Sequence, residues 1–157
     1  MIIVQQFTLH LKNTTQRPII TLEGGIDAMI DTGSLFPIWV KDEKLLIKLG
    51  GKLIKSNVSF TGFGGSTFGN LYELDLLKIG KLIYPKFHII TCIASLPCYM
   101  ILSATMFSGL LYEIDDHNHK FNISIPDTQS AVRNLVIKET NGTLHVLCIY
   151  NADMNVF

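Results

Sequence analysis

Ala28-Met29-Ile30-Asp31-Thr32-Gly33-Ser34 is the most informative stretch in this chain of 157 residues. The apolar residues that begin at Ile26 are typical of a buried strand, and Thr32-Gly33 is typical of a tight turn. The pattern therefore predicts a strand that ends on an acidic side chain and carries it into the turn. Asp31 is the leading candidate for chemistry in this sequence.

A carboxylate in such a turn has a clear chemical use when a second carboxylate lies beside it. Two close carboxylates cannot both ionise, so they share one proton, and their titration belongs to the pair. One accepts a proton from water while the other donates to a peptide carbonyl, which needs no metal and no covalent intermediate. The neighbours fit this use. The Thr32 hydroxyl can anchor the turn, Gly33 lets backbone amides approach, and Ser34 is expected to donate to Asp31 and keep it ionised.

The rest of the chain is predicted to be mostly strands with one clear helix. Leucines recur at helical spacing within residues 41–49, and Gly50 ends that segment. A glycine-rich run from Phe60 to Gly69 follows it. Apolar or alternating patterns predict strands at residues 7–11, 18–23, 71–79, 82–90, 99–102, 110–114 and 121–125. The length suits one mostly β domain with a core of its own.

This order of motifs resembles the retropepsin family, the retroviral and retroviral-like aspartic proteases. The resemblance includes the strand into Asp31-Thr32-Gly33-Ser34, the apolar pair Ile38-Trp39, the helix and the glycine-rich run. It also includes residues 100–107, Met-Ile-Leu-Ser-Ala-Thr-Met-Phe, which are similar to a family segment of two aliphatic residues, glycine, a polar pair and more apolar residues. The resemblance implies a retropepsin-like aspartic protease domain over residues 1–126.

The resemblance implies a closed, β-barrel-like acid protease fold with one or two short helices. Pepsin-like proteases carry two Asp-Thr-Gly motifs in one chain, and this chain has one, so a two-fold homodimer with one Asp31 from each subunit is implied. The implied activity is that of an aspartic endopeptidase without a cofactor, acting on a peptide or protein substrate. The implied catalytic residues are Asp31, Thr32, Gly33 and Ser34, and the supporting residues are Ile101, Leu102 and Ser103.

The resemblance also implies a flap, which is a hairpin that closes over an extended peptide and excludes water. The glycine-rich run supplies it, with Gly62, Phe63, Gly64, Gly65 and Ser66 as the expected substrate-binding residues. The same run can also be a plain flexible hairpin. It lacks the Gly-Lys-Ser/Thr ending of a phosphate-binding loop.

Ser103 and Thr105 depart from the family pattern, which usually has glycine at the first place and Asp or Asn at the second. They keep a second hypothesis open, in which a retropepsin-like dimer holds an extended peptide without cutting it. A third hypothesis is an interaction protein that contacts a larger assembly through its glycine-rich loop and C-terminal hairpin, with a structural Asp31. The Asp-Thr-Gly-Ser run can also be an ordinary turn.

Composition argues against several other classes of function. Thirteen basic residues balance thirteen acidic ones, so no excess positive charge exists to collect nucleic acid. The apolar runs are too short to span a bilayer, and no export signal follows Met1, so no membrane partner is expected. The three cysteines are odd in number and lack Cys-x-x-Cys spacing. A reducing cytoplasm without a disulfide framework is therefore expected.

Two weaker candidates lie outside the main motif. His117 and His119 beside two aspartates could form a metal site, although a polar turn explains them equally well. Cys92 and Cys148 could be nucleophiles, although they are expected to be small buried residues of strands.

Residues 127–157 are predicted to form a C-terminal extension. Residues 126–130 are expected to be a linker, and strands at residues 135–138 and 144–148 flank Asn141-Gly142, a strong hairpin signal. This hairpin is expected to lie at the dimer interface, to dock on its own subunit, or to bind another partner.

Overall fold

The structure is a computed structural model that describes residues 1–12, 17–62 and 64–151. Most of this part of the chain forms strands, as the sequence predicts. The strands are β1 (Ile3–His10), β2 (Ile19–Leu22), β3 (Ile26–Asp31), β4 (Ile38–Trp39), β5 (Lys52–Gly62), β6 (Gly65–Ile79), β7 (Leu82–Thr91), β8 (Met100–Ser103), β9 (Leu111–Asp115), β10 (Lys120–Pro126), β11 (Gln129–Thr140) and β12 (Thr143–Asn151). Its helical segments are α1 (Glu43–Lys48) and the 3₁₀ turns η1 (Glu23–Gly25) and η2 (Ala104–Phe107).

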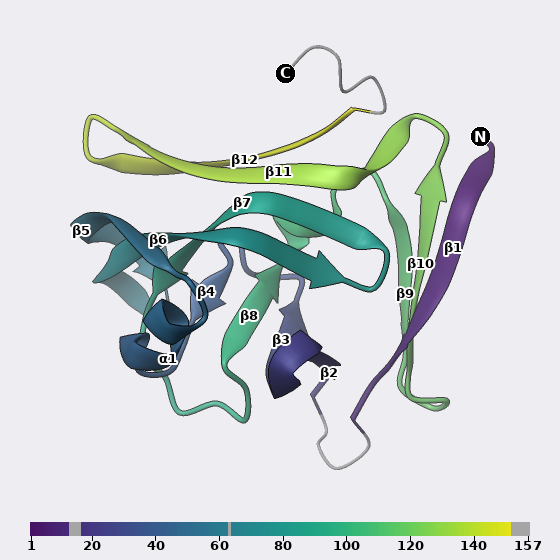
Figure 1. The fold of residues 1–157 in the computed structure, drawn as a ribbon, viewed down its shortest axis with the longest axis horizontal. Helices are drawn as coiled ribbons and strands as arrows, with labels where there is room; N and C mark the ends of the chain where they lie inside the picture. Colours follow the sequence, from purple (N-terminus) through teal and green to yellow (C-terminus); the bar gives the residue numbers. More distant parts are fainter. Residues whose placement is uncertain (13–16, 63, 152–157) are drawn as a thin grey trace.

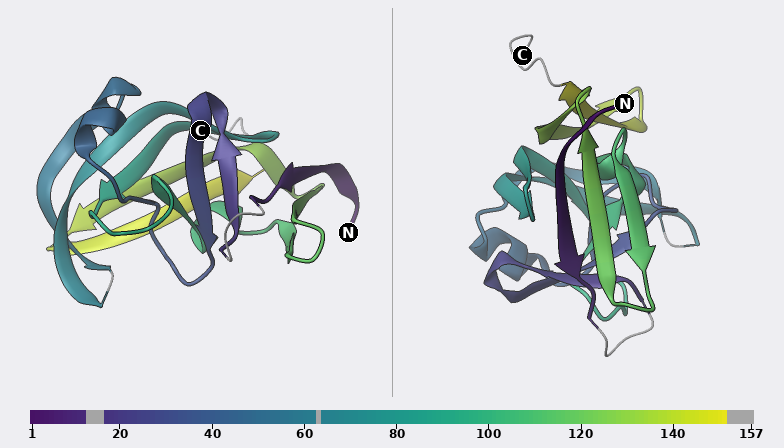
Figure 2. Two further views of the ribbon diagram at one scale, coloured as in Figure 1. Left: turned by 90° about the horizontal axis from the view of Figure 1, so that it is seen from below. Right: turned by 90° about the vertical axis from the view of Figure 1, so that its right-hand side faces the viewer.

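The strands form two sheets (Figures 1 and 2). A three-stranded antiparallel sheet, in the order β1-β10-β9, lies at the right of Figure 1. The larger, nine-stranded sheet follows the path β12-β11-β7-β4-β8-β3-β2, and the β5–β6 hairpin joins it through β7. Among the described strands no ladder joins β12 to β2, so the predicted closed barrel is not found. The C-terminal hairpin extends the sheet beyond β7 instead of returning to β2, which leaves both ends open.

The buried apolar side chains form one continuous cluster. Along β10, Phe121, Ile123 and Ile125 are buried and alternate with partly exposed residues, which is the period of two that the sequence indicates. Trp39 is 1% exposed and lies on the short strand β4, in the middle of the large sheet. Within the described ranges, no helix is long and apolar enough to cross a membrane.

Helix α1 confirms the predicted helix at residues 41–49, with slightly shorter ends. Asp42 caps it by accepting the backbone N–H of Lys44 at 2.8 Å. The carboxylate of Glu43, the first helical residue, accepts hydrogen bonds from the Tyr72 hydroxyl at 2.5 Å and from the Asn70 amide at 2.8 Å. Burial, together with this carboxylate, raises the pKa of Tyr72 to about 12. Glu43 therefore ties the helix to β6.

The C-terminal hairpin consists of β11 and β12 and turns at Asn141-Gly142, as the sequence predicts. The two turn residues have positive φ values of 52° and 79°, which asparagine and glycine adopt most readily. The predicted linker at residues 126–130 is instead a tight turn, because β10 ends at Pro126 and β11 begins at Gln129. Since β11 pairs in parallel with β7, the hairpin docks on its own subunit.

Candidate functional site

Asp31 lies at the end of β3, which pairs in parallel with β8. In this register Ile30 is opposite Leu102, and Asp31 is opposite Ser103. Ile101, Leu102 and Ser103 are all 0% exposed. The predicted supporting residues therefore lie on the buried strand beside the one that carries Asp31, and their packing fixes its direction.

The turn after β3 is held by its own backbone. The Gly33 N–H donates to the Asp31 carboxylate at 3.0 Å, and the Ser34 N–H donates to the Asp31 carbonyl at 3.1 Å. A Cβ at residue 33 would lie 3.3 Å from the same carboxylate oxygen, so a side chain at this position would crowd the carboxylate. Thr32 and Gly33 are exposed and Asp31 is partly buried, so the turn faces solvent in the single chain.

Ser34 does not make the hydrogen bond that the sequence predicts. Its hydroxyl donates to the Phe36 carbonyl at 2.8 Å, and a serine hydroxyl has only one proton to donate. Serine side chains commonly bond to nearby backbone groups, and here the carbonyl two residues onward lies within reach. The Gly33 amide, rather than the Ser34 hydroxyl, is the donor to Asp31.

Two hydroxyls lie behind the turn, where the family pattern has glycine and Asp or Asn. Thr105 donates to the Leu35 carbonyl at 2.7 Å. Because this uses its one proton, the Ser103 hydroxyl must be the donor in its own 2.7 Å contact with Thr105. The Ala104 N–H also donates to the Ser34 carbonyl at 3.1 Å. Ser103 is thus accommodated in a chain of hydrogen bonds that joins η2 to the loop after Asp31.

We expect Thr105→Val to lower the free energy of unfolding by about 2 kcal/mol, since the Leu35 carbonyl loses its donor and the buried Ser103 hydroxyl loses its acceptor. Unfolding in denaturant measures the change. Adding Ser103→Ala should recover part of the loss, because it removes the unpaired hydroxyl. A double variant that loses as much as the two single variants together contradicts this chain of hydrogen bonds.

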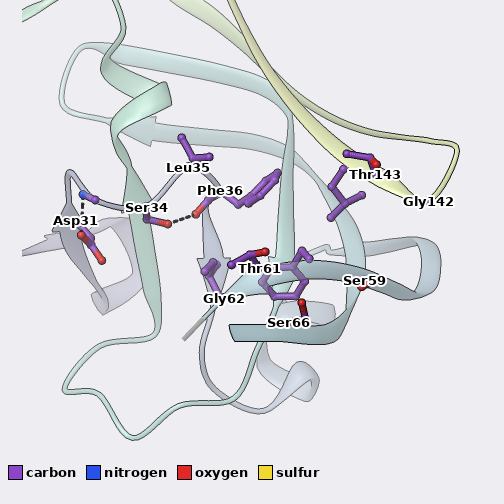
Figure 3. A pocket seen from close by; sticks show the side chains of 14 residues that line it. Asp31, Ser34, Leu35, Phe36, Ser59, Thr61, Gly62, Ser66, Gly142 and Thr143 are labelled. Carbon is purple, nitrogen blue, oxygen red and sulfur yellow. Dashed lines mark hydrogen bonds between the residues drawn. The ribbon is translucent and has the colours of Figure 1, made fainter. Parts of the chain in front are cut away.

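A cleft of about 570 Å³ opens beside Asp31 (Figure 3). The loop after the Asp31 turn, the β5–β6 hairpin and the tip of the C-terminal hairpin surround it. The rings of Phe36 and Phe60 meet edge to face with centroids 6.2 Å apart, so the loop and the β5–β6 hairpin touch through apolar surface. The lining residues are Asp31, Gly33, Ser34, Leu35, Phe36, Ile38, Ser59, Phe60, Thr61, Gly62, Ser66, Gly142, Thr143 and Leu144.

The predicted flap residues lie at the end of the β5–β6 hairpin. Gly62 and Ser66 line the cleft. Gly64 and Gly65 have φ values of 76° and 142°, a region that glycine adopts without strain. Phe63 lies outside the described residues. The glycine-rich run is therefore the end of a long antiparallel hairpin that borders the same cleft as Asp31.

Comparison with known proteins bears on this arrangement. The sequence matches no family model and no curated protein significantly. Among solved structures, the chain is similar to a retropepsin-like aspartic protease from Rickettsia conorii, with a TM-score of 0.53, coverage of 77% of this chain and 91% of that chain, and 16% sequence identity. The fold is retropepsin-like. At such low identity the likeness concerns the fold, and activity has to be judged from the chemistry of the site.

The other candidate groups do not line the cleft of this retropepsin-like fold. Burial raises the pKa of the thiols of Cys92, Cys98 and Cys148, which disfavours a thiolate nucleophile. Asp115 accepts two hydrogen bonds from Asn118, which keep the pKa of Asp115 below its usual value and make this segment a polar turn. Over residues 1–12, 17–62 and 64–151, no three His, Cys, Asp or Glu side chains gather as metal ligands.

Several residues that line the cleft were not predicted from the sequence. Leu35 and Phe36 directly follow the Asp31-Thr32-Gly33-Ser34 turn, so their position could have indicated them. Ser59 and Thr61 lie on β5, Ser59 directly before the glycine-rich run and Thr61 near its start. The hairpin tip at residues 142–144 is distant in sequence from Asp31, and only the docking of β11 on β7 brings it to the cleft.

Proposed function

We propose that this chain is an aspartic endopeptidase that works as a two-fold homodimer. Two Asp31 carboxylates, one from each subunit, share a proton and activate a water molecule that attacks the peptide carbonyl. The observation that carries the proposal is the environment of Asp31. This residue ends a strand of a retropepsin-like fold, accepts the Gly33 amide at 3.0 Å, and borders a cleft of suitable size for a peptide segment.

The single chain supports the need for a partner. Asp31 is the one acidic side chain among the described residues that line the cleft, whereas the proposed water activation needs two carboxylates. Thr32 and Gly33 are exposed, and the side chain of Leu35 is 62% exposed beside them. An exposed, partly apolar turn next to Asp31 suits contact with a second copy about a two-fold axis.

The proposed substrate is an extended peptide that lies between the loop after Asp31 and the β5–β6 hairpin. Such a peptide is recognised by main-chain hydrogen bonds and by alternating side-chain pockets. Closure of the hairpin excludes bulk water from the reacting carbonyl. The reaction requires no metal or organic cofactor, because the paired carboxylates activate the water. A reducing cytoplasm is the proposed location.

One alternative is a retropepsin-like dimer that binds an extended peptide without cutting it. The Ser103–Thr105 hydroxyl pair favours this alternative, because these residues replace the glycine and the Asp or Asn of the family pattern. Intact peptide recovered from a stable complex with the wild-type protein would distinguish binding from cleavage.

The rate of cleavage per chain should fall on dilution, because only the dimer holds two carboxylates. We expect cuts in a proteome-derived peptide library at about pH 4 to 7, with apolar residues around the cleaved bond. Sedimentation of the same samples measures the fraction of dimer, and the rate should follow that fraction. A rate per chain that stays constant while the dimer dissociates rules out a shared catalytic centre.

A further inference from the structure

The tip of the C-terminal hairpin forms part of the cleft that contains Asp31. Gly142, Thr143 and Leu144 line this cleft. In Figure 3, Gly142 and Thr143 lie at the opposite side of the cleft from Asp31. These residues belong neither to the catalytic turn nor to the β5–β6 hairpin, so the cleft has a third wall. We call residues 142–144 the hairpin wall.

A buried arginine fixes the base of the C-terminal hairpin that carries the hairpin wall. Arg133 on β11 is 0% exposed. Its Nε donates to the Met106 carbonyl at 3.0 Å, and a terminal nitrogen donates to the Ser108 carbonyl. Met106 lies in η2, the segment that also bonds to the loop after Asp31. The hairpin is therefore tied to the elements behind the catalytic turn.

Two further contacts tie the hairpin to the neighbouring strands. The Ile137 N–H of β11 donates to Nδ1 of His88 on β7 at 3.0 Å. Lys55 of β5 forms an ion pair with Glu139 of β11, close to the hairpin turn. β12 also lies against β5. Because β5 leads into the glycine-rich run, the C-terminal hairpin packs against the strand that carries the proposed flap.

The hairpin wall combines an apolar side chain with an exposed polar one. Leu144 is partly buried against the core and lines the cleft with Phe36 and Phe60. Thr143 is exposed and lies at the rim. Apolar pockets with a few polar groups at the edge are typical of sites that select one side chain of a ligand. The chemistry of this end of the cleft therefore suits an aliphatic side chain.

We propose that the hairpin wall determines substrate preference: Leu144, with Phe36 and Phe60, accepts an aliphatic side chain of an extended peptide, and Thr143 contacts an adjacent residue at the rim. The inference rests on the proposed function, which makes a peptide the occupant of the cleft. In a two-fold dimer with the Asp31 pair on the axis, one hairpin wall lies on each side of that pair. The preference therefore falls on two peptide positions, one on each side of the cleaved bond and both away from it.

Introducing a positive or a negative charge at Thr143 tests this proposal. We expect Thr143→Lys to raise the relative use of peptides with an acidic residue at such a position about fivefold, and Thr143→Glu to do the same for basic residues. Leu144→Ala should reduce the preference for a large aliphatic residue about tenfold. The matched controls are Leu147→Lys and Leu147→Glu, which place the same charges on β12 at a side chain that is 58% exposed and outside the cleft.

Two readouts are needed: the sequences of cleaved peptides, and those of uncut peptides retained by the protein. A shift in the Thr143 and Leu144 variants but not in the Leu147 controls, in either readout, supports the hairpin wall. If that shift occurs among retained peptides and nothing is cleaved, the hairpin wall stands and the proposed protease fails. Cleavage with the same preference in all variants, or an equal shift in the Leu147 controls, overturns the hairpin wall and leaves the protease. No cleavage and no difference in retained peptides overturns both.

Discussion

Asp31→Asn should lower the rate of peptide cleavage at least about a thousandfold while leaving the fold and the dimer intact. An amide side chain cannot take a proton from the attacking water, so the shared centre loses its base. The turn should keep its shape, because the Gly33 N–H that donates to Asp31 Oδ1 at 3.0 Å can donate equally to an amide oxygen. Cleavage of the selected library peptides, with circular dichroism and sedimentation of the same samples, measures the three quantities.

Asp116→Asn is the matched control, since it makes the same change at an exposed residue of a polar turn and should retain full activity.

Mixing wild-type and variant subunits tests directly whether two chains share one catalytic centre. Wild-type and Asp31→Asn chains are mixed in equal amounts and left to exchange subunits. The mixture should show about a quarter of the activity of pure wild-type protein at the same total chain concentration, because only dimers of two wild-type chains are active. Retention of half would mean that each chain works alone, and cleavage by Asp31→Asn itself would refute the assignment.

The parts of the fold that the sequence predicts are those with strong local signals. The strand into Asp31, the helix at residues 41–49 and the turn at Asn141-Gly142 each depend on side chains within a few residues of one another. Each is found in the structure. The position of β8 beside β3 was accessible only through the family resemblance, because parallel pairing joins segments that are far apart in the sequence.

Other parts lack a local signal for identifiable reasons. Most side chains of β5 are exposed, so its residues show no regular alternation of buried and exposed positions. For this reason no strand was predicted before the glycine-rich run. The hydroxyl of Ser34 has two acceptors within a few residues, and only the path of the chain decides that the Phe36 carbonyl receives its proton. The open sheet follows from the docking of β11 on β7, a contact between distant segments. The same docking places the hairpin wall at the cleft.

The strand predicted at residues 135–138 is shorter than β11, and Arg133 is the reason that its start was missed. A charged residue normally marks an exposed position, so the strand is predicted to begin only after Arg133. In the structure β11 already starts at Gln129, and the guanidinium is buried against backbone carbonyls of η2 and the residue after it. Those acceptors come from another part of the chain, so no pattern within β11 could predict them.

Arg133→Met should lower the free energy of unfolding by about 3 kcal/mol, which corresponds to a fall of about 10 °C in the melting temperature. Methionine keeps much of the apolar stem but has no donor, so the Ser108 carbonyl loses the guanidinium. The Met106 carbonyl loses one of its two donors and keeps the Tyr84 hydroxyl at 2.7 Å. Thermal and denaturant unfolding of the full chain measure the change.

Two further variants separate hydrogen bonding from charge. Arg133→Lys keeps the positive charge but lacks the planar fork that donates in two directions, so it should be intermediate in stability. Lys138→Met removes an exposed cation from the same strand and should change the free energy of unfolding by less than about 0.5 kcal/mol. If Arg133→Met unfolds at the wild-type denaturant concentration, the arginine does not hold the hairpin. If Arg133→Lys is as stable as wild type, charge alone holds it, and the bonds to Met106 and Ser108 are not its cause.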